Sequence, residues 1–476
     1  MGNSYFSMAD SLNGMRDAAV ESTMHLLGIG GSVDGGFDGG SPPVRVSPLG
    51  GRYEGSSFVA GGVVTDPTGQ YAATIPIGPE WPFHDLASMV AYYNNRINEL
   101  FDDWWQIPQD RDFEALVAQC GHGAQLLATD AQLDPGKGSA SPFGANVNLS
   151  QIATIQQQIG RFDGAAMQAF AANYANRLPI VVDGQDAVAC FLWLGAAGEQ
   201  EIWKRAMQGV ADIAAQGRTA MEQSDEGGGD ASAVLTIAGA LASVVGVVPG
   251  LGTGVSIAVK LAGTALSTAS KFAPKGSETV PLGAGNPIAV LDNIQTALEK
   301  LSQQIADEEN DLAKHLSQVQ GVVTSQSPSF DIAAPPIYDD TNPGDFRTAD
   351  DTRVHFGTLR TIARQTMPMI AGELKRAAGQ FDGGSSSGPW SRPAGIGSGS
   401  VGPFHEWDSL RSTLVGILDN TSLEIERAAD HLEIVADDFE KTDAQIRKDL
   451  EAHTAQVDKE DEVHLSPTGA GGRHPI

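Results

Sequence analysis

The clearest element of the chain lies between residues 405 and 453, where the sequence reads HEWDSLRSTLVGILDNTSLEIERAADHLEIVADDFEKTDAQIRKDLEAH. Steps of three and four residues connect fourteen positions in it, of which eleven are apolar. These seam positions are Trp407, Leu410, Leu414, Ile417, Thr421, Ile425, Ala428, Leu432, Val435, Phe439, Thr442, Ile446, Leu450 and His453. This spacing is typical of a coiled coil, so we expect one long helix over about 404–455, roughly 70 Å in length. Such a helix must lie along a partner, either in its own chain or in another.

Helical periodicity also marks three earlier parts of the chain, namely 81–225, 286–325 and 354–382. In the first of these, we expect interruptions at Leu178-Pro179 and at Asp183-Gly184, because proline and glycine break helices. The sequence therefore predicts an all-α fold, built as elongated helical hairpins or a bundle that ends in the long coiled-coil-like helix.

The remaining segments lack helical periodicity. Residues 1–80 are rich in glycine and predict a partly β or disordered arm with at most a small hairpin. Residues 326–353 predict an acidic, proline-rich linker, and 383–403 a flexible Gly/Ser/Pro linker. Residues 456–476 predict a flexible tail.

A hydrophobic hairpin is predicted between residues 226 and 285. Positions 231–259 hold no charged residue, and Pro249-Gly250 separates two apolar arms. Each arm is close to the lower length limit for crossing a bilayer. The segment 231–272 is therefore interpreted either as a buried helical hairpin of the core or as a membrane-inserting hairpin that turns at Pro249 and Gly250.

Composition and motifs exclude several classes of protein. The 59 acidic against 30 basic residues give a net charge of −29, which argues against a nucleic-acid partner. Cys120 and Cys190 are the two cysteines, too few for a disulfide framework and without metal-ligand spacing. No catalytic, metal or cofactor motif stands in a suitable context, so we expect a non-enzymatic protein without cofactor or metal. The first residues also lack the apolar core of a Sec signal peptide.

Residues 162–170 read FDGAAMQAF and resemble the turn and second helix of the WXG-type proteins, the helical-hairpin substrates of actinobacterial ESX (type VII) secretion systems. In that family, an aromatic-x-Gly turn joins two antiparallel helices. The resemblance assigns the hairpin turn to Phe162 and Gly164, with phenylalanine in place of the usual tryptophan.

The C-terminal helix carries the second half of this resemblance. Type VII substrates have a YxxxD/E export signal near the end of a helix, and this chain has Phe439-Glu440-Lys441-Thr442-Asp443. Phenylalanine again replaces the family's aromatic residue. Phe439 and Asp443 are thus the candidate secretion signal, one helical turn apart.

The resemblance implies a secreted or envelope-associated interaction or assembly protein, exported without a Sec signal peptide. Its expected partners are a helical protein or a second copy of itself, together with secretion machinery or a chaperone, and contact with a membrane is possible. Two alternatives stay open. One is a membrane-inserting, pore-forming-like protein that uses 231–272, and the other is a cytoplasmic coiled-coil scaffold.

Overall fold

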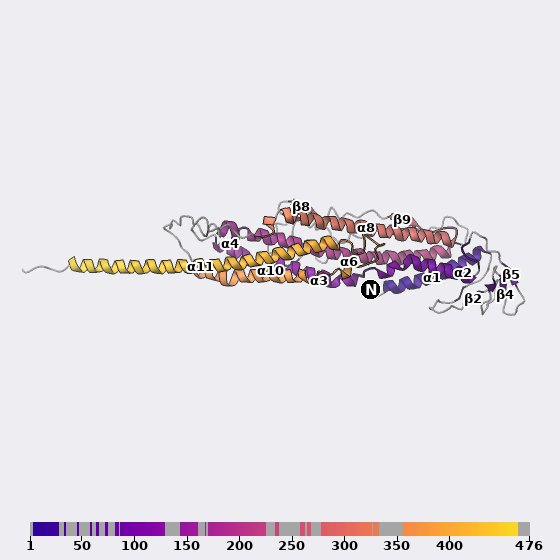
Figure 1. Cartoon of the computed structure of the whole chain (residues 1–476), viewed down its shortest axis with the longest axis horizontal. Coiled ribbons are helices and arrows are strands. Elements are labelled where there is room, and N and C mark those ends of the chain that lie inside the picture. The colour runs from indigo at the N-terminus through magenta and orange to yellow at the C-terminus, as the bar shows by residue number, and fades with distance from the viewer. Residues whose placement is uncertain are drawn as a thin grey trace, which may run out of the picture.

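The long helix α6 (Leu178–Glu222) lies at the centre of the computed structural model, and the other long helices pack around it in an elongated bundle (Figure 1). The predicted predominantly helical fold is therefore confirmed. The structure describes residues 3–27, 33–34, 45–46, 58–59, 63–65, 72–74, 81–84, 86–128, 143–159, 167, 170–224, 234–237, 258–261, 264–267, 278–325, 327–332 and 356–464.

Eight further helices accompany α6 in the described residues, and short 3-10 and π-helical turns lie between some of them. The helices are α1 (Asn3–Leu26), α2 (Leu86–Phe101), α3 (Asp110–Leu127), α4 (Gln151–Ile159), α8 (Pro287–Ser325), α9 (Phe356–Thr361), α10 (Met367–Asp382) and α11 (Phe404–His464). The turns are η1 (Asp103–Gln106), η2 (Ala171–Ala175), η4 (Ser327–Ser329), η6 (Ile362–Thr366) and η7 (Gly388–Trp390). The predicted helical regions 286–325 and 354–382 coincide with α8 and with the run α9–η6–α10.

The central stretch of helix α6 is buried because it is apolar on every side. Its residues 188–196 are buried without interruption, and a helix with no polar face is stable only inside a core or a membrane. Among the helices that the structure describes, α6 is the one whose length and composition would allow it to cross a membrane, and 61% of its most apolar window is buried in the bundle. Packing by α1, α3, α8 and α11 thus provides this helix with its apolar surroundings.

The interruption predicted at Asp183-Gly184 is wrong, because α6 continues through it. Pro179 stands in the first turn of the helix, where a missing N–H breaks no hydrogen bond. Gly184 allows a close approach instead of a turn: a Cβ at this position would lie 2.8 Å from the backbone oxygen of Ser329. Gly195 has the same role toward Trp407, whose Cδ1 would lie 3.0 Å from such a Cβ.

The prediction of an arm without helix over residues 1–80 is also wrong, since α1 occupies its first part. Met15 and Met24 are fully buried in the core. Helix α1 has no clear apolar periodicity, because polar residues share its buried face. Ser22 is hydrogen-bonded to Ser224 at 2.7 Å, and Thr23 lies 2.7 Å from the hydroxyl of Tyr93. These long-range hydrogen bonds satisfy groups that local periodicity counts as surface.

Short antiparallel strands lie in two regions, between α1 and α2 and between α6 and α8. In the N-terminal region they are β1 (Val33–Asp34), β2 (Arg45–Val46), β3 (Phe58–Val59), β4 (Val63–Thr65) and β5 (Ala72–Thr74), paired β1 with β2 and β3-β4-β5. In the central region they are β6 (Val234–Ile237), β7 (Ala258–Leu261), β8 (Thr264–Ser267) and β9 (Glu278–Pro281), paired β6 with β9 and β7 with β8. The helical form expected for 231–272 is therefore wrong at β6, β7 and β8. Branched Val, Ile and Thr side chains in these runs favour strands.

Helix α11 begins where the sequence predicts and ends later, at His464, so residues 456–464 belong to the helix and not to the tail. Its buried positions follow the predicted seam closely, but Leu418 and Ala436 are fully buried where Ile417 and Val435 were expected. The shift has a geometric reason. A straight helix of 3.6 residues per turn drifts relative to a strict seven-residue repeat, and α11 packs on several helices, among them α10, α8 and α6.

Two glycine substitutions test the close approach at Gly184. Gly184→Ala should lower the free energy of unfolding by about 1–3 kcal/mol, because the new methyl group collides with the Ser329 backbone. Gly372→Ala is the matched control, since a Cβ there meets nothing within 4 Å, and it should raise the free energy by about 0.5–1 kcal/mol. Urea unfolding followed by circular dichroism measures both. Equal stabilisation by the two variants would contradict the packing.

Candidate functional site

The residues singled out in the sequence lie in different parts of the chain. Phe162 and Gly164, the candidate hairpin turn, and Pro249 and Gly250, the candidate turn of the hydrophobic hairpin, lie outside the described residues. The structure therefore does not test these four assignments. The candidate secretion signal falls within α11, and its two positions are one turn apart on that helix.

The candidate signal lies where α11 leaves the bundle. Leu432 and Ala436 are the last buried side chains among the described residues of α11. Beyond them the helix continues away from the body of the molecule until His464 (Figure 1). Position 439 thus comes three residues after Ala436, near the place where α11 leaves the bundle, which we call the root of the projecting segment.

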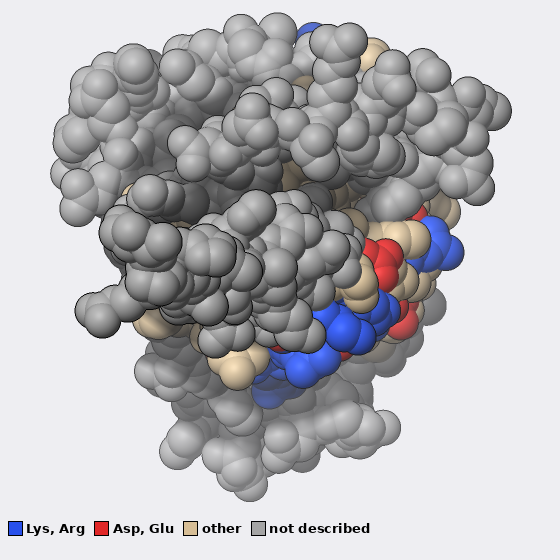
Figure 2. Space-filling model, turned by 90° about the vertical axis from the view of Figure 1, so that its left-hand side faces the viewer, with Lys and Arg blue, Asp and Glu red and all other residues tan. Residues whose placement is uncertain are grey.

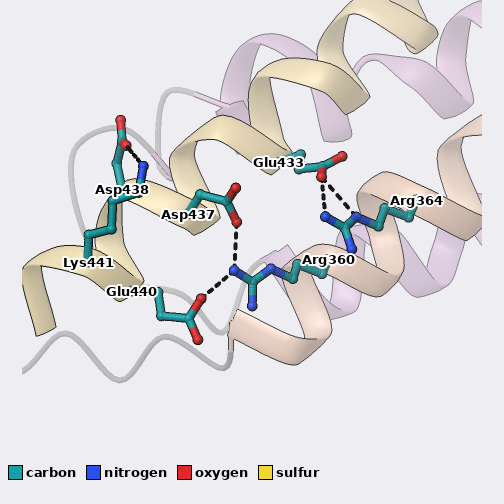
Figure 3. A network of polar contacts seen from close by, with 7 residues as sticks. All are labelled: Arg360, Arg364, Glu433, Asp437, Asp438, Glu440 and Lys441. Carbon is teal, nitrogen blue, oxygen red and sulfur yellow. Dashed lines mark hydrogen bonds and ion pairs between the residues drawn. The ribbon is translucent and has the colours of Figure 1, made fainter. Parts of the chain in front are cut away.

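A network of exposed ion pairs, here called the ladder, fixes this root (Figure 3). The ladder consists of Arg360 and Arg364 on one side and Glu433, Asp437 and Glu440 of α11 on the other. Arg360 donates to Asp437 at 2.6 Å and also to Glu440, so its two partners stand on either side of position 439. Arg364 donates from Nε to Glu433 at 2.9 Å, one turn earlier along α11.

Within the ladder, Arg360 and Asp437 favour each other's charged form. The hydrogen bond from Arg360 holds the pKa of Asp437 below its usual value, because it stabilises the carboxylate. The hydrogen bonds that Arg360 donates, to Glu440 first and to Asp437 second, raise the pKa of Arg360. Viewed from this end of the molecule, Lys and Arg side chains lie beside Asp and Glu side chains at the surface (Figure 2). The network holds α11 by charge pairing at the root of the projecting segment.

A second polar cluster lies inside the bundle. It is covered by the segment of residues 388–402, and we call this segment the clasp. The flexible linker predicted over 383–403 is wrong here, because the clasp is packed into the core: Trp390 is fully buried, and Ile396 and Arg392 nearly so. The ring of Trp390 lies 5.3 Å from Phe113 of α3 and 5.6 Å from Trp407 of α11, measured between centroids. The clasp therefore joins these two helices.

Arg392 of the clasp pairs with two carboxylates, Glu199 of α6 and Glu309 of α8. Its Nη1 lies 3.5 Å from Glu199, and its Nη2 donates to Glu309. All three side chains have no exposure to solvent. Trp203 donates to Glu199 at 2.8 Å, and its ring stacks under the guanidinium at 4.9 Å. We refer to Glu199, Glu309 and Arg392 as the triad.

The glycines of the clasp are needed for the triad. Gly397 and Gly402 have φ angles of 70° and 48°, which residues with side chains rarely adopt. A Cβ on Gly397 would collide with Glu309, and one on Gly402 with Arg392. The backbone N–H of Ser398 donates to Glu309 at 2.6 Å. The glycines that make the sequence look like a flexible linker instead let the backbone of the clasp approach the buried side chains of Glu309 and Arg392.

A cavity of about 490 Å³ borders the outer face of the clasp. Residues 395–397 form one wall, and polar and apolar side chains of α2, η1 and α8 form the others. Ser302 of α8 accepts from the N–H of Gly397 at 3.2 Å and donates to the oxygen of Gly395 at 3.1 Å. The position of the clasp therefore sets the shape of the cavity.

Comparison with family models, with curated proteins and with solved structures finds no match to this chain. The resemblance to type VII substrates thus stays a prediction from the sequence. Sequence reasoning missed the triad, although one signal was present: Glu199 is an acidic residue inside the most apolar helical stretch of the chain.

Neutralising the ladder should loosen the root of the projecting helix. In Arg360→Gln, backbone amides 437–444 should exchange hydrogen about two- to five-fold faster, because exposed pairs contribute modestly. Hydrogen exchange with mass spectrometry measures this, and the difference should shrink in 1 M NaCl as the charges are screened.

Arg427→Gln is the control for the ladder, because Arg427 pairs with Glu424 inside α11 at 2.6 Å and makes no bridge to α9 in the contacts described. Its amides 437–444 should exchange at the wild-type rate. The ladder would have no role at the root if both variants behaved alike.

Proposed function

We propose that this chain is a non-enzymatic helical interaction or assembly protein, exported by a type VII-like secretion system, and that its projecting C-terminal helix makes the decisive contacts. The observation that carries the proposal is the course of α11 (Figure 1). The structure describes buried side chains in α11 as far as Ala436, the ladder pairs with the helix at Asp437 and Glu440, and the helix then projects beyond the bundle.

A projecting helix favours a partner for an energetic reason. Most helical stability in proteins comes from tertiary packing, and isolated helices are marginal in water. Docking on another helix would provide the packing that the bundle provides up to position 436. A helical partner protein, a second copy of the chain, or a component of the secretion machinery could supply it.

The candidate secretion signal stands at the first turns of this projecting segment. Positions 439 and 443 share one face of α11 because they are four residues apart. Recognition of an aromatic residue and a carboxylate at this spacing requires a helix that is not buried by its own bundle. The exit of α11 next to position 439 supports this requirement.

Export is tested in the native host, with and without its type VII ATPase, by fractionation and immunoblotting. The wild-type chain should be found in the medium or the envelope only when the ATPase is present. Phe439→Ala and Asp443→Ala should each reduce the exported fraction strongly while the cytosolic pool remains.

Ile434→Ala and Asp438→Ala form the matched control pair. They have the same four-residue spacing five residues earlier on α11, and both residues are exposed. Export of these variants should be unchanged. A wild-type chain that stays in the cytosol in both strains would exclude the export proposal and favour a cytoplasmic coiled-coil scaffold.

A further inference from the structure

The triad holds more negative than positive charge in a place that water does not reach. Glu199 and Glu309 are two carboxylates, Arg392 is one guanidinium, and the exposure of each side chain is 0%. An unpaired buried charge is very costly, and protein sites avoid it by binding or releasing a proton. The neutral composition of this site is one guanidinium, one carboxylate and one carboxylic acid.

We propose that the triad is a proton-controlled lock: the clasp closes on the bundle while the two carboxyl groups hold one proton, and loosens when that proton leaves. The proton is held by the carboxyl groups of Glu199 on α6 and Glu309 on α8. Arg392 connects the clasp to these two groups. Loss of the proton leaves two carboxylates against one guanidinium. The resulting excess charge is relieved when water enters and the clasp moves outward.

Glu199 is the carboxyl group that binds the proton. Burial raises the pKa of Glu199 well above its usual value, and the nearby carboxylate of Glu309 raises it further, while Arg392 opposes both effects. A hydrogen bond between the two carboxyl groups also favours the protonated form, because it needs the proton. Oε2 of Glu199 accepts from no N–H or O–H donor of the described residues, which adds to the cost of ionising it.

The other elements around the site contribute few charges. The charges that act on Glu199 come from Glu309 of α8 and Arg392 of the clasp, while α6 itself contributes the N–H of Trp203. Helices α3 and α11 face the clasp with aromatic rings, Phe113 and Trp407. The electrostatic balance is thus set within the triad.

The direction of the pH dependence follows from the raised pKa. Since the folded chain holds this proton more tightly than the unfolded chain, the stabilisation is complete below the ordinary glutamate pKa of about 4.3. It is lost progressively as the pH rises through the pKa that Glu199 has in the folded chain. The lock is therefore closed at acidic pH and opens toward alkaline pH.

Opening would be felt at two places. The wall of the cavity at residues 395–397 belongs to the clasp, so the cavity changes shape when the clasp moves. Trp390 packs on Phe404 and Trp407 at centroid distances of 5.9 and 5.6 Å, so the first turns of α11 lose their cover. The lock does not depend on export or on the secretion signal.

Hydrogen exchange of the full chain between pH 6 and pH 10, corrected for the intrinsic exchange rate, tests the lock. In the wild type, amides of 388–402 should lose about tenfold or more of their protection across this range, since one pKa unit corresponds to tenfold. Glu199→Gln, which mimics the protonated form, should keep its protection throughout. Glu309→Gln also removes the excess charge and should likewise keep its protection. It provides a second test if Glu199→Gln folds poorly.

Asp186→Asn is the matched control, because Asp186 is another carboxyl of α6 whose pKa burial raises, to about 7, and it takes no part in the triad. Its clasp should open with pH as in the wild type, and α3 amides report on global unfolding. The proposal is overturned if wild-type clasp protection does not fall with pH, if it falls equally in the two glutamine variants, or if α3 opens in parallel.

Discussion

The burial of α6 is the constraint on which the rest of this structure depends. The apolar stretch 188–196 of this 45-residue helix cannot remain in water, and α1, α3, α8 and α11 pack on the helix and cover it. Glycines at 184, 195 and 217 let neighbours approach its backbone. Because the cover comes from both ends of the chain, the bundle depends on contacts between residues more than 200 positions apart, such as Trp407 and the Leu192 carbonyl.

The helical class and the positions of α8 and α11 could be predicted because each depends on a local sequence pattern. In both helices apolar residues recur at three- and four-residue steps, and this pattern needs no knowledge of the partner. The helix α1 could not be predicted so, because Ser22 and Thr23 turn to the core and are satisfied by Ser224 and Tyr93. Where polar groups are paired over long range, periodicity loses its information.

The clasp shows a second limit of sequence reasoning. Glycine, serine and proline in 383–403 predict mobility, but at Gly397 and Gly402 glycine serves a fixed backbone that closes over buried charge. The same composition occurs in a mobile linker and in a fixed, packed segment. In this sequence, only Trp390, Arg392 and the acidic Glu199 in an apolar helix distinguish the two. At the candidate secretion signal, the sequence supplied the residue spacing, whereas the exit of α11 at that point is a property of the whole bundle.

The continuity of α11 has a mechanical consequence. One unbroken helix connects Phe404, under the clasp, with the ladder at Asp437 and with the free end at His464. At 1.5 Å per residue, roughly 50 Å of this rod lie on the bundle side of the ladder and roughly 36 Å beyond it. The ladder therefore has the place of a fulcrum, and α11 that of a lever whose inner arm rests on the clasp and whose outer arm reaches into the surroundings.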